Sequence, residues 1–167
     1  VMPRSTGAAI PTLNGNGTAT QTGLIIPMNG FPGKYFVVST AGGGGDVKYV
    51  VVDMNLFGGL GAVENTSLTP TGNGTLLLPS GGGFCEGALS IPEFSGANVP
   101  TGENWLIFQT MAGNAFNVVK TNGAGFTAPV VQNVGFGPAG QAARIMKTNS
   151  CFDQIANSFY NDATVEV

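Results

Sequence analysis

The stretch NWLIFQTMAGNAFNVVKT, residues 104–121, decides the fold because it contains two mostly apolar arms separated by a short Ala-Gly-Asn loop. A loop of about three residues with glycine at a permissive position is typical of a β-hairpin. Side chains alternate between the two faces of a strand, and both faces of the first arm are largely apolar. We therefore expect a central hairpin that is covered on both sides. One face carries Trp105, Ile107 and Gln109, and the other carries Leu106, Phe108 and Thr110.

The same pattern extends outward along the whole chain. Short apolar or β-branched runs alternate with clusters of Gly, Pro and Asn, a spacing typical of β-sandwiches and barrels. The chain has 27 glycines, and turns such as NGFPG (29–33) supply residues that tolerate positive φ. The predicted strands are 18–26, 34–40, 47–57, 75–79, 84–91, 104–111, 115–121, 126–134, 142–148 and 163–167.

Two segments carry more specific expectations. In KYVVVDMNLF (48–57), Val50, Val52, Met54 and Leu56 share a fully apolar face, which we assign to the core. The segment CFDQIANSFY (151–160) follows Ser150, a candidate N-cap, and spaces its apolar residues as one helix face would. It is the one short helix that the sequence predicts.

The predicted fold class is all-β, a single antiparallel β-sandwich, jelly-roll-like or immunoglobulin-like, with long glycine-rich loops and at most one short helix. A chain of 167 residues fits one domain, 1–167, since single cores commonly serve domains of this size. We expect an N-terminal arm at about 1–17 and a C-terminal strand at about 163–167.

Charge is scarce in this chain. Charged residues make up 9% of it, where about 25% is usual, so Asn, Thr, Ser, Gln, Gly and apolar atoms must form much of its surface. Six basic residues are scattered and the net charge is −3, which argues against nucleic-acid binding. With no basic patch and no apolar run near the roughly 20 residues of a spanning helix, we expect no membrane insertion.

The sequence predicts no catalytic, cofactor-binding or metal-binding residues. Histidine is absent, which removes the commonest general base and metal ligand. The glycine-rich stretches 41–46 and 135–141 lack the flanking sequence of a phosphate or dinucleotide site. Calcium ligation by Asp46, Asp53 and Asn55, and pairing of two among the nine carboxylates, remain alternatives to solvated loop carboxylates.

A few residues are candidates for modification or binding. Cys85 and Cys151 are compatible with one disulfide or with two buried thiols. Asn16, Asn65 and Asn73 stand in glycosylation sequons, two of them in a doubled Gly-Asn-Gly-Thr that predicts exposed turns. Trp105 could stack on a sugar ring, although a Trp in an apolar strand more often belongs to the core.

These features favour a non-enzymatic structural protein that works by assembly. Our first hypothesis is a virion component, such as a capsid decoration protein, a minor capsid protein or a fibre-associated domain. A secreted filament or surface-layer subunit that assembles by strand addition is the second, and a carbohydrate-binding module or lectin is the third. The expected partners are copies of itself or other structural subunits, with glycan contact as the alternative, at a virion surface or outside the cell.

Overall fold

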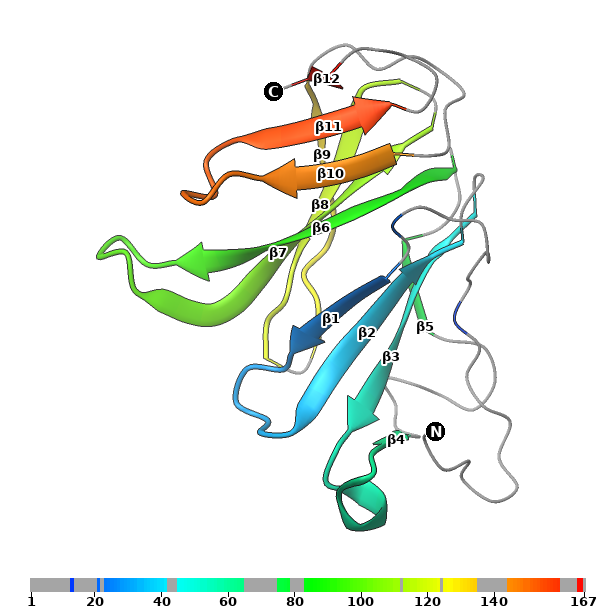
Figure 1. The fold of residues 1–167 in the computed structure, drawn as a ribbon, viewed down its shortest axis with the longest axis vertical. Helices are drawn as coiled ribbons and strands as arrows, with labels where there is room; N and C mark the ends of the chain where they lie inside the picture. Colours follow the sequence, from blue (N-terminus) through cyan, green and yellow to red (C-terminus); the bar gives the residue numbers. More distant parts are fainter. Residues whose placement is uncertain are drawn as a thin grey trace.

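The computed structural model describes residues 13, 21, 23–41, 45–64, 75–78, 83–111, 113–123, 125–134, 144–159 and 165–166. These residues confirm the all-β fold class, because they form antiparallel sheets and a single short 3-10 turn (Figure 1). The strands belong to three sheets. No helix in the described ranges is long and apolar enough to cross a membrane.

The first sheet is built from the N-terminal half of the chain. Its strands are β1 (Gly23–Pro27), β2 (Lys34–Thr40), β3 (Val47–Asp53), β4 (Ala62–Val63) and β5 (Thr75–Leu78). They lie in the order β1-β2-β3-β4, and β5 also pairs with β3. The expected NGFPG turn joins β1 to β2, and a 3-10 turn, η1 (Leu56–Gly59), lies between β3 and β4.

The second sheet contains the hairpin that the sequence predicts. Its strands are β6 (Phe84–Phe94), β7 (Pro100–Thr110), β8 (Ala115–Lys120) and β9 (Val130–Asn133), paired in that order. Strands β7 and β8 pair in an antiparallel register that places Ile107 opposite Val118. Gly113 in the connecting loop has a φ of +112°, a conformation that side chains with a Cβ rarely adopt.

The third sheet consists of β10 (Arg144–Thr148), β11 (Ile155–Phe159) and β12 (Val165–Glu166). The predicted helix over 151–160 is wrong, because its first half is a turn and its second half is β11. The Asn149 side chain accepts the backbone amides of Asp153 and Gln154 at 3.2 and 3.3 Å, which stabilises the turn. Pairing of β11 with β10 along its whole length prevails over the helical spacing of its apolar residues.

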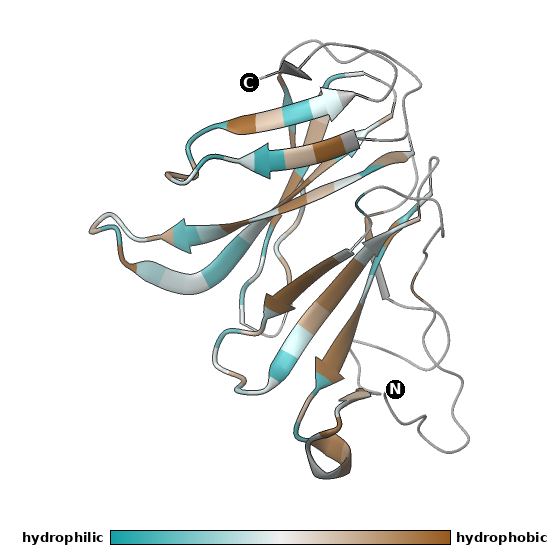
Figure 2. Ribbon diagram, viewed as in Figure 1, coloured by the Kyte–Doolittle hydropathy of each residue, from teal (hydrophilic) through white to brown (hydrophobic). Residues whose placement is uncertain are grey.

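One face of the second sheet shares a hydrophobic core with the first sheet. Phe108 is fully buried there, and Phe36 and Tyr49 of the first sheet form an aromatic cluster with Phe126 from the loop after β8. Figure 2 shows β1 and β3 as hydrophobic over most of their length. The buried residues of this core are Ile26, Met28, Phe36, Val38, Val47, Tyr49, Val51, Leu78, Phe84, Ala88, Leu106, Phe108 and Val119.

The opposite face of the second sheet packs against the third. Leu89 and Ile107 are buried with Met146 of β10 in a smaller hydrophobic cluster. Asn157 of β11 donates a buried side-chain hydrogen bond to Gln109 of β7. The middle of the hairpin is therefore covered on both sides, as the sequence predicts.

The predicted core face of residues 48–57 is correct for Val50 and Val52, which are buried, and wrong for Met54 and Leu56. Strand β3 ends at Asp53, and Met54 and Leu56 are exposed in the loop that follows. The side chains that join the core shared with the second sheet are Tyr49 and Val51, on the other face of the strand. Val50 and Val52 are also buried, so β3 is covered on both faces and its apolar run did not distinguish them.

The other predicted strands differ from the observed ones mainly at their ends. Strand β2 has the predicted bounds, and β12 lies within the range expected for a C-terminal strand. The expected N-terminal arm, 1–17, lies outside the described residues except for Leu13.

Candidate functional site

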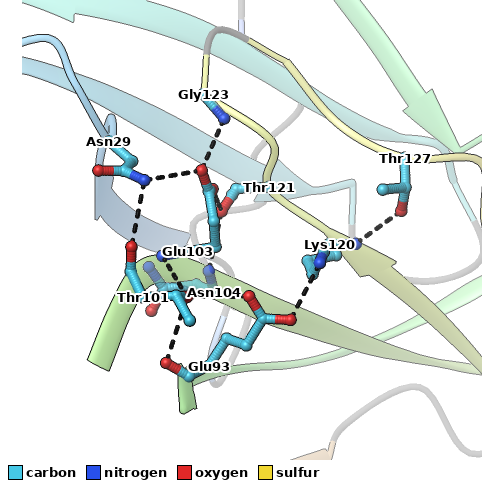
Figure 3. Close-up of polar contacts among 9 residues, drawn as sticks. All are labelled: Asn29, Glu93, Thr101, Glu103, Asn104, Lys120, Thr121, Gly123 and Thr127. Atoms are coloured by element: carbon cyan, nitrogen blue, oxygen red, sulfur yellow. Dashed lines mark hydrogen bonds and ion pairs between the residues drawn. The ribbon is translucent and has the colours of Figure 1, made fainter. Parts of the chain in front are cut away.

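A cluster of polar side chains lies where the β1–β2 turn meets the second sheet (Figure 3). The β1–β2 turn contributes the side-chain amide of Asn29. The paired ends of β6, β7 and β8 contribute carboxylates, a hydroxyl and an amine. The segment after β8 contributes two threonine hydroxyls and the Gly123 backbone amide. Its members are Asn29, Glu93, Thr101, Glu103, Asn104, Lys120, Thr121, Gly123 and Thr127.

Glu103 is the centre of one half of this cluster. Its carboxylate accepts hydrogen bonds from Asn29 Nδ2 at 2.9 Å, from the Gly123 amide at 2.8 Å and from the Thr121 hydroxyl. Burial alone would raise the pKa of the Glu103 carboxyl, but the hydrogen bonds from Thr121, Asn29 and Gly123 together outweigh it and lower that pKa.

Asn29 can approach Glu103 closely because the residue before Glu103 is glycine. Gly102 has a φ of +87°, and a Cβ at this position would lie 2.7 Å from Asn29 Oδ1. Asn29 also donates to the Thr101 carbonyl at 3.3 Å. The turn of the first sheet is thereby fastened to the start of β7.

Glu93 is the centre of the other half. It accepts a charge-assisted hydrogen bond from Lys120 Nζ at 2.9 Å and a hydrogen bond from the Thr101 hydroxyl at 2.8 Å. The bond from Lys120, followed by the bond from Thr101, lowers the pKa of the Glu93 carboxyl. Thr101 therefore connects the two halves, since its hydroxyl contacts Glu93 and its carbonyl contacts Asn29.

This arrangement suits a structural role better than acid and base chemistry. A general acid needs a carboxyl whose pKa is raised, whereas the pKa values of Glu93 and Glu103 are both lowered. Each carboxylate is already engaged: Glu93 by donors from β7 and β8, and Glu103 by donors from the β1–β2 turn and the segment after β8. Among the described residues, no group of three or more His, Cys, Asp or Glu side chains could hold a metal ion.

Trp105 lies beside this cluster, and its side chain is 37% exposed. The expectation that it belongs to the core is therefore not met. Lys120 pairs with it across the strands and holds its Nζ 5.3 Å from the centre of the indole ring. The Lys120 cation, itself held by Glu93, occupies one of the two ring faces on which a sugar could stack.

A second polar group lies at the end of β3. Lys34 Nζ lies 2.7 Å from Glu64 Oε1 and 3.6 Å from Asp53 Oδ2, and its hydrogen bond to Glu64 raises the pKa of the lysine. Asp53 also accepts the Asn55 amide at 2.8 Å, which lowers the pKa of its carboxyl. Asp53, one of the residues proposed to bind calcium, is therefore already paired with a lysine and bonded to a backbone amide. These partners occupy the carboxylate oxygens that a calcium ion would need.

The remaining predicted residues are not brought together. Cys85 is buried in β6 and Cys151 is exposed in the turn before β11, and no disulfide joins them. One cysteine is therefore buried and the other is exposed. Asn16, Asn65 and Asn73, and with them both Gly-Asn-Gly-Thr turns, lie outside the described residues.

Exposed apolar side chains form two further surfaces. The first, the apolar tip, consists of Phe31, Met54, Leu56, Phe57 and Leu60 in the two turns at one end of the first sheet. The second, the β9 edge, is strand β9 with Val134, where Val130, Val131 and Val134 are exposed. Neither surface contains a charged residue.

No protein-family model, curated protein or solved structure matches this chain. The proposals below therefore depend on the geometry of the chain itself.

Sequence reasoning missed most of the polar cluster and both apolar surfaces. Thr101, Asn29 and Thr121 come from three separate elements, and only their pairing in space gives them a common role. A local signal did exist at Gly102, because a glycine within a strand often marks a close approach of another segment.

Proposed function

We propose that this chain is a non-enzymatic structural protein that assembles with copies of itself. The setting we propose is a virion, as a capsid decoration protein, a minor capsid protein or a fibre-associated domain. An extracellular filament or surface-layer subunit is the alternative. The scattered basic residues favour an outer surface over contact with a genome. We further propose that the first and second sheets are the two halves of one sandwich.

The β9 edge is the observation that carries this proposal. Strand β9 is the last strand in the described order of the second sheet, and all four of its residues are exposed. Val131 is 56% exposed. Edge strands that remain single usually carry charges, prolines or bulges that prevent pairing with another chain. Strand β9 itself contains no charged residue or proline, so it is suited to strand addition.

We propose a specific pairing on the basis of the hydrogen-bond ladder between β8 and β9. The Val134 amide donates to the Asn114 carbonyl at 3.1 Å, so alternate residues of β9 direct their backbone toward β8. The backbone groups of Val131 and Asn133 therefore point to the open side. An antiparallel pair of β9 strands centred on Gln132 lets Val131 of each copy exchange both bonds with Asn133 of the other. The same register places Val130 opposite Val134, which joins two exposed apolar side chains.

The alternatives receive less support from the geometry. Both carboxylates of the polar cluster have lowered pKa values and fixed donors, which does not favour an enzyme. The indole of Trp105 already has a lysine over its ring, which does not favour a lectin.

Light scattering coupled to size-exclusion chromatography, followed by negative-stain microscopy, tests the proposal. We expect the wild-type chain to form dimers or larger assemblies, and Val131→Lys to be monomeric because it places a charge at the pairing strand. Val99→Lys is the matched control, since Val99 is 57% exposed in the loop between β6 and β7. A wild-type chain that stays monomeric at its highest soluble concentration contradicts the proposal. Equal effects of both substitutions contradict the assignment to β9.

A further inference from the structure

The apolar tip is a second surface whose chemistry differs from that of an edge strand. Phe57 is 51% exposed and Leu60 is 65% exposed. Both belong to the loop around η1, at the end of the first sheet remote from β10 and β11 (Figure 1). Phe31 is 40% exposed in the β1–β2 turn, which is hydrogen-bonded to this loop. Several large apolar side chains are thus held in water at one end of the molecule, which marks a binding surface.

The two turns of the tip are fastened to each other. Asn55 Nδ2 donates to the Pro32 carbonyl at 3.0 Å, and the Met54 amide donates to the Gly33 carbonyl at 2.8 Å. Gly33 lies so close to the Asn55 side chain that a Cβ there would be 2.7 Å from Nδ2. The tip is therefore preorganised, and binding through it requires little ordering of the chain.

The backbone within the tip satisfies much of its own hydrogen bonding. The Phe31 amide donates to the Met28 carbonyl at 3.1 Å, and the Leu60 and Gly61 amides donate to the carbonyls of Phe57 and Leu56 at 3.4 and 3.2 Å. Phe57 reaches this closed turn through a φ of +52°, which is unusual for a residue with a Cβ. A lipid phase offers no hydrogen-bond partners, so internal pairing of this kind suits insertion into lipid.

Charge distinguishes the classes of partner. Residues 28–33 and 54–61 contain no charged side chain. Lys34 pairs with Asp53 and Glu64 at the base of the tip, and Glu103 is bonded to Asn29 on the side of the β1–β2 turn that meets β7. Anionic lipids are recognised by basic clusters, which the tip lacks. The side-chain amides of Asn29 and Asn55 already donate within this chain, so exposed apolar side chains are what the tip presents to a partner.

We propose that the apolar tip inserts into the surface of a bilayer of neutral phospholipid. Phe31, Leu56, Phe57 and Leu60 enter the region between headgroups and acyl chains, and the Lys34, Asp53 and Glu64 group remains in water. Such a tip needs neither a spanning helix nor basic residues, the two features whose absence argued against membrane insertion. The site is separate from the β9 edge and does not depend on assembly through it.

Flotation of the whole chain with phosphatidylcholine vesicles tests this inference. We expect the wild-type chain to float with the vesicles, equally at low and high salt because no charge is involved. Leu60→Glu should reduce the partition coefficient about tenfold or more, since burial of one leucine accounts for an effect of this size. Leu60→Gln should weaken it in the same direction without adding a charge.

Two further variants distinguish the tip from the rest of the protein surface. Val99→Glu is the matched control, because Val99 is exposed outside the tip and its substitution should leave flotation unchanged. Val131→Lys should also float, because it alters only the β9 edge. Circular dichroism should show that every variant is folded, since all the substituted side chains are exposed. The inference is overturned if the wild-type chain does not float, if flotation requires anionic lipid, or if Leu60→Glu floats as well as Val99→Glu.

Discussion

The two faces of the second sheet are packed in different ways. Toward the first sheet, Leu106, Phe108 and Val119 belong to a large buried core that includes an aromatic cluster. Toward the third sheet, Leu89 and Ile107 pack with Met146, which is the one buried hydrophobic side chain in the described part of that sheet, and with the partly buried Ile155. The second contact also contains a buried amide pair, Gln109 with Asn157.

This difference separates two roles. Free energy of burial grows with the apolar area removed from water, so the first face should supply most of the stability of the fold. The second face buries less apolar surface and includes polar atoms that must find partners inside the protein. The hairpin of β10 and β11 should therefore open locally at a lower free energy than the rest of the molecule.

The largest effect should come from Phe108→Ala compared with Met146→Ala. Phe108 is fully buried in the larger core, and truncation of such a residue costs about 3 to 5 kcal/mol of unfolding free energy. Met146→Ala should reduce the free energy of global unfolding by about 2 kcal/mol, at the low end of such truncations, because the hairpin can undock before the rest unfolds. Urea denaturation measures both values.

Hydrogen exchange distinguishes local from global loss of stability in the same two variants. Met146→Ala should reduce protection in β10 and β11 and preserve it in β2, β3, β7 and β8. Phe108→Ala should reduce protection in all of these strands together. Equal loss throughout the molecule in both variants would show that the two faces unfold as one unit.

The same comparison explains which parts of the structure the sequence could predict. The hairpin of β7 and β8 was predictable because its arms, its loop and its apolar faces are all local. Strand β11 was not, because the spacing of Ile155 and Ala156 also fits a helix and only pairing with β10 decides between them. The prediction for β3 was only partly correct for a related reason, since a strand buried on both faces has no polar face that shows which side joins the larger core.

The polar cluster was harder to predict than any strand. Glu103 was one carboxylate among nine, and its partners come from the β1–β2 turn, the end of β8 and the following loop. No spacing within the sequence indicates that these residues lie close to Glu103. The apolar tip was missed because Met54, Leu56 and Phe57 continue the apolar pattern of β3 after the strand has ended.

An intermediate effect should come from the amide pair of Gln109 and Asn157. It tests whether a specific hydrogen bond helps to hold the third sheet on the second. Gln109 Nε2 and Asn157 Oδ1 are buried and have no hydrogen-bond partner among the described residues. Asn157→Ala should reduce the unfolding free energy by about 1 to 3 kcal/mol, because it leaves Gln109 Oε1 buried without its donor. Replacement of both residues by leucine should be nearly neutral, since no polar atom is then left behind. A double-mutant cycle from urea denaturation gives the coupling, and additive losses would contradict it.

The smallest effect on stability should come from acid. Acid should weaken only the contact between the first and second sheets. Asn29 and Glu103 connect the first sheet to the second, and the lowered pKa of Glu103 means that the folded protein binds its proton less readily than the unfolded chain. Stability from this group is therefore complete above the ordinary glutamate pKa of 4.5 and is lost as the pH falls through the lower folded pKa. Glu103→Gln should reduce stability by a few tenths to about 1 kcal/mol at pH 7 and make the loss of stability below pH 4.5 less steep.

Exchange protection in β10 and β11 relative to β7 should not fall in acid, because the Gln109 and Asn157 amides do not titrate. If stability depends on pH in the same way in wild type and Glu103→Gln, this carboxylate does not stabilise the contact between the two sheets.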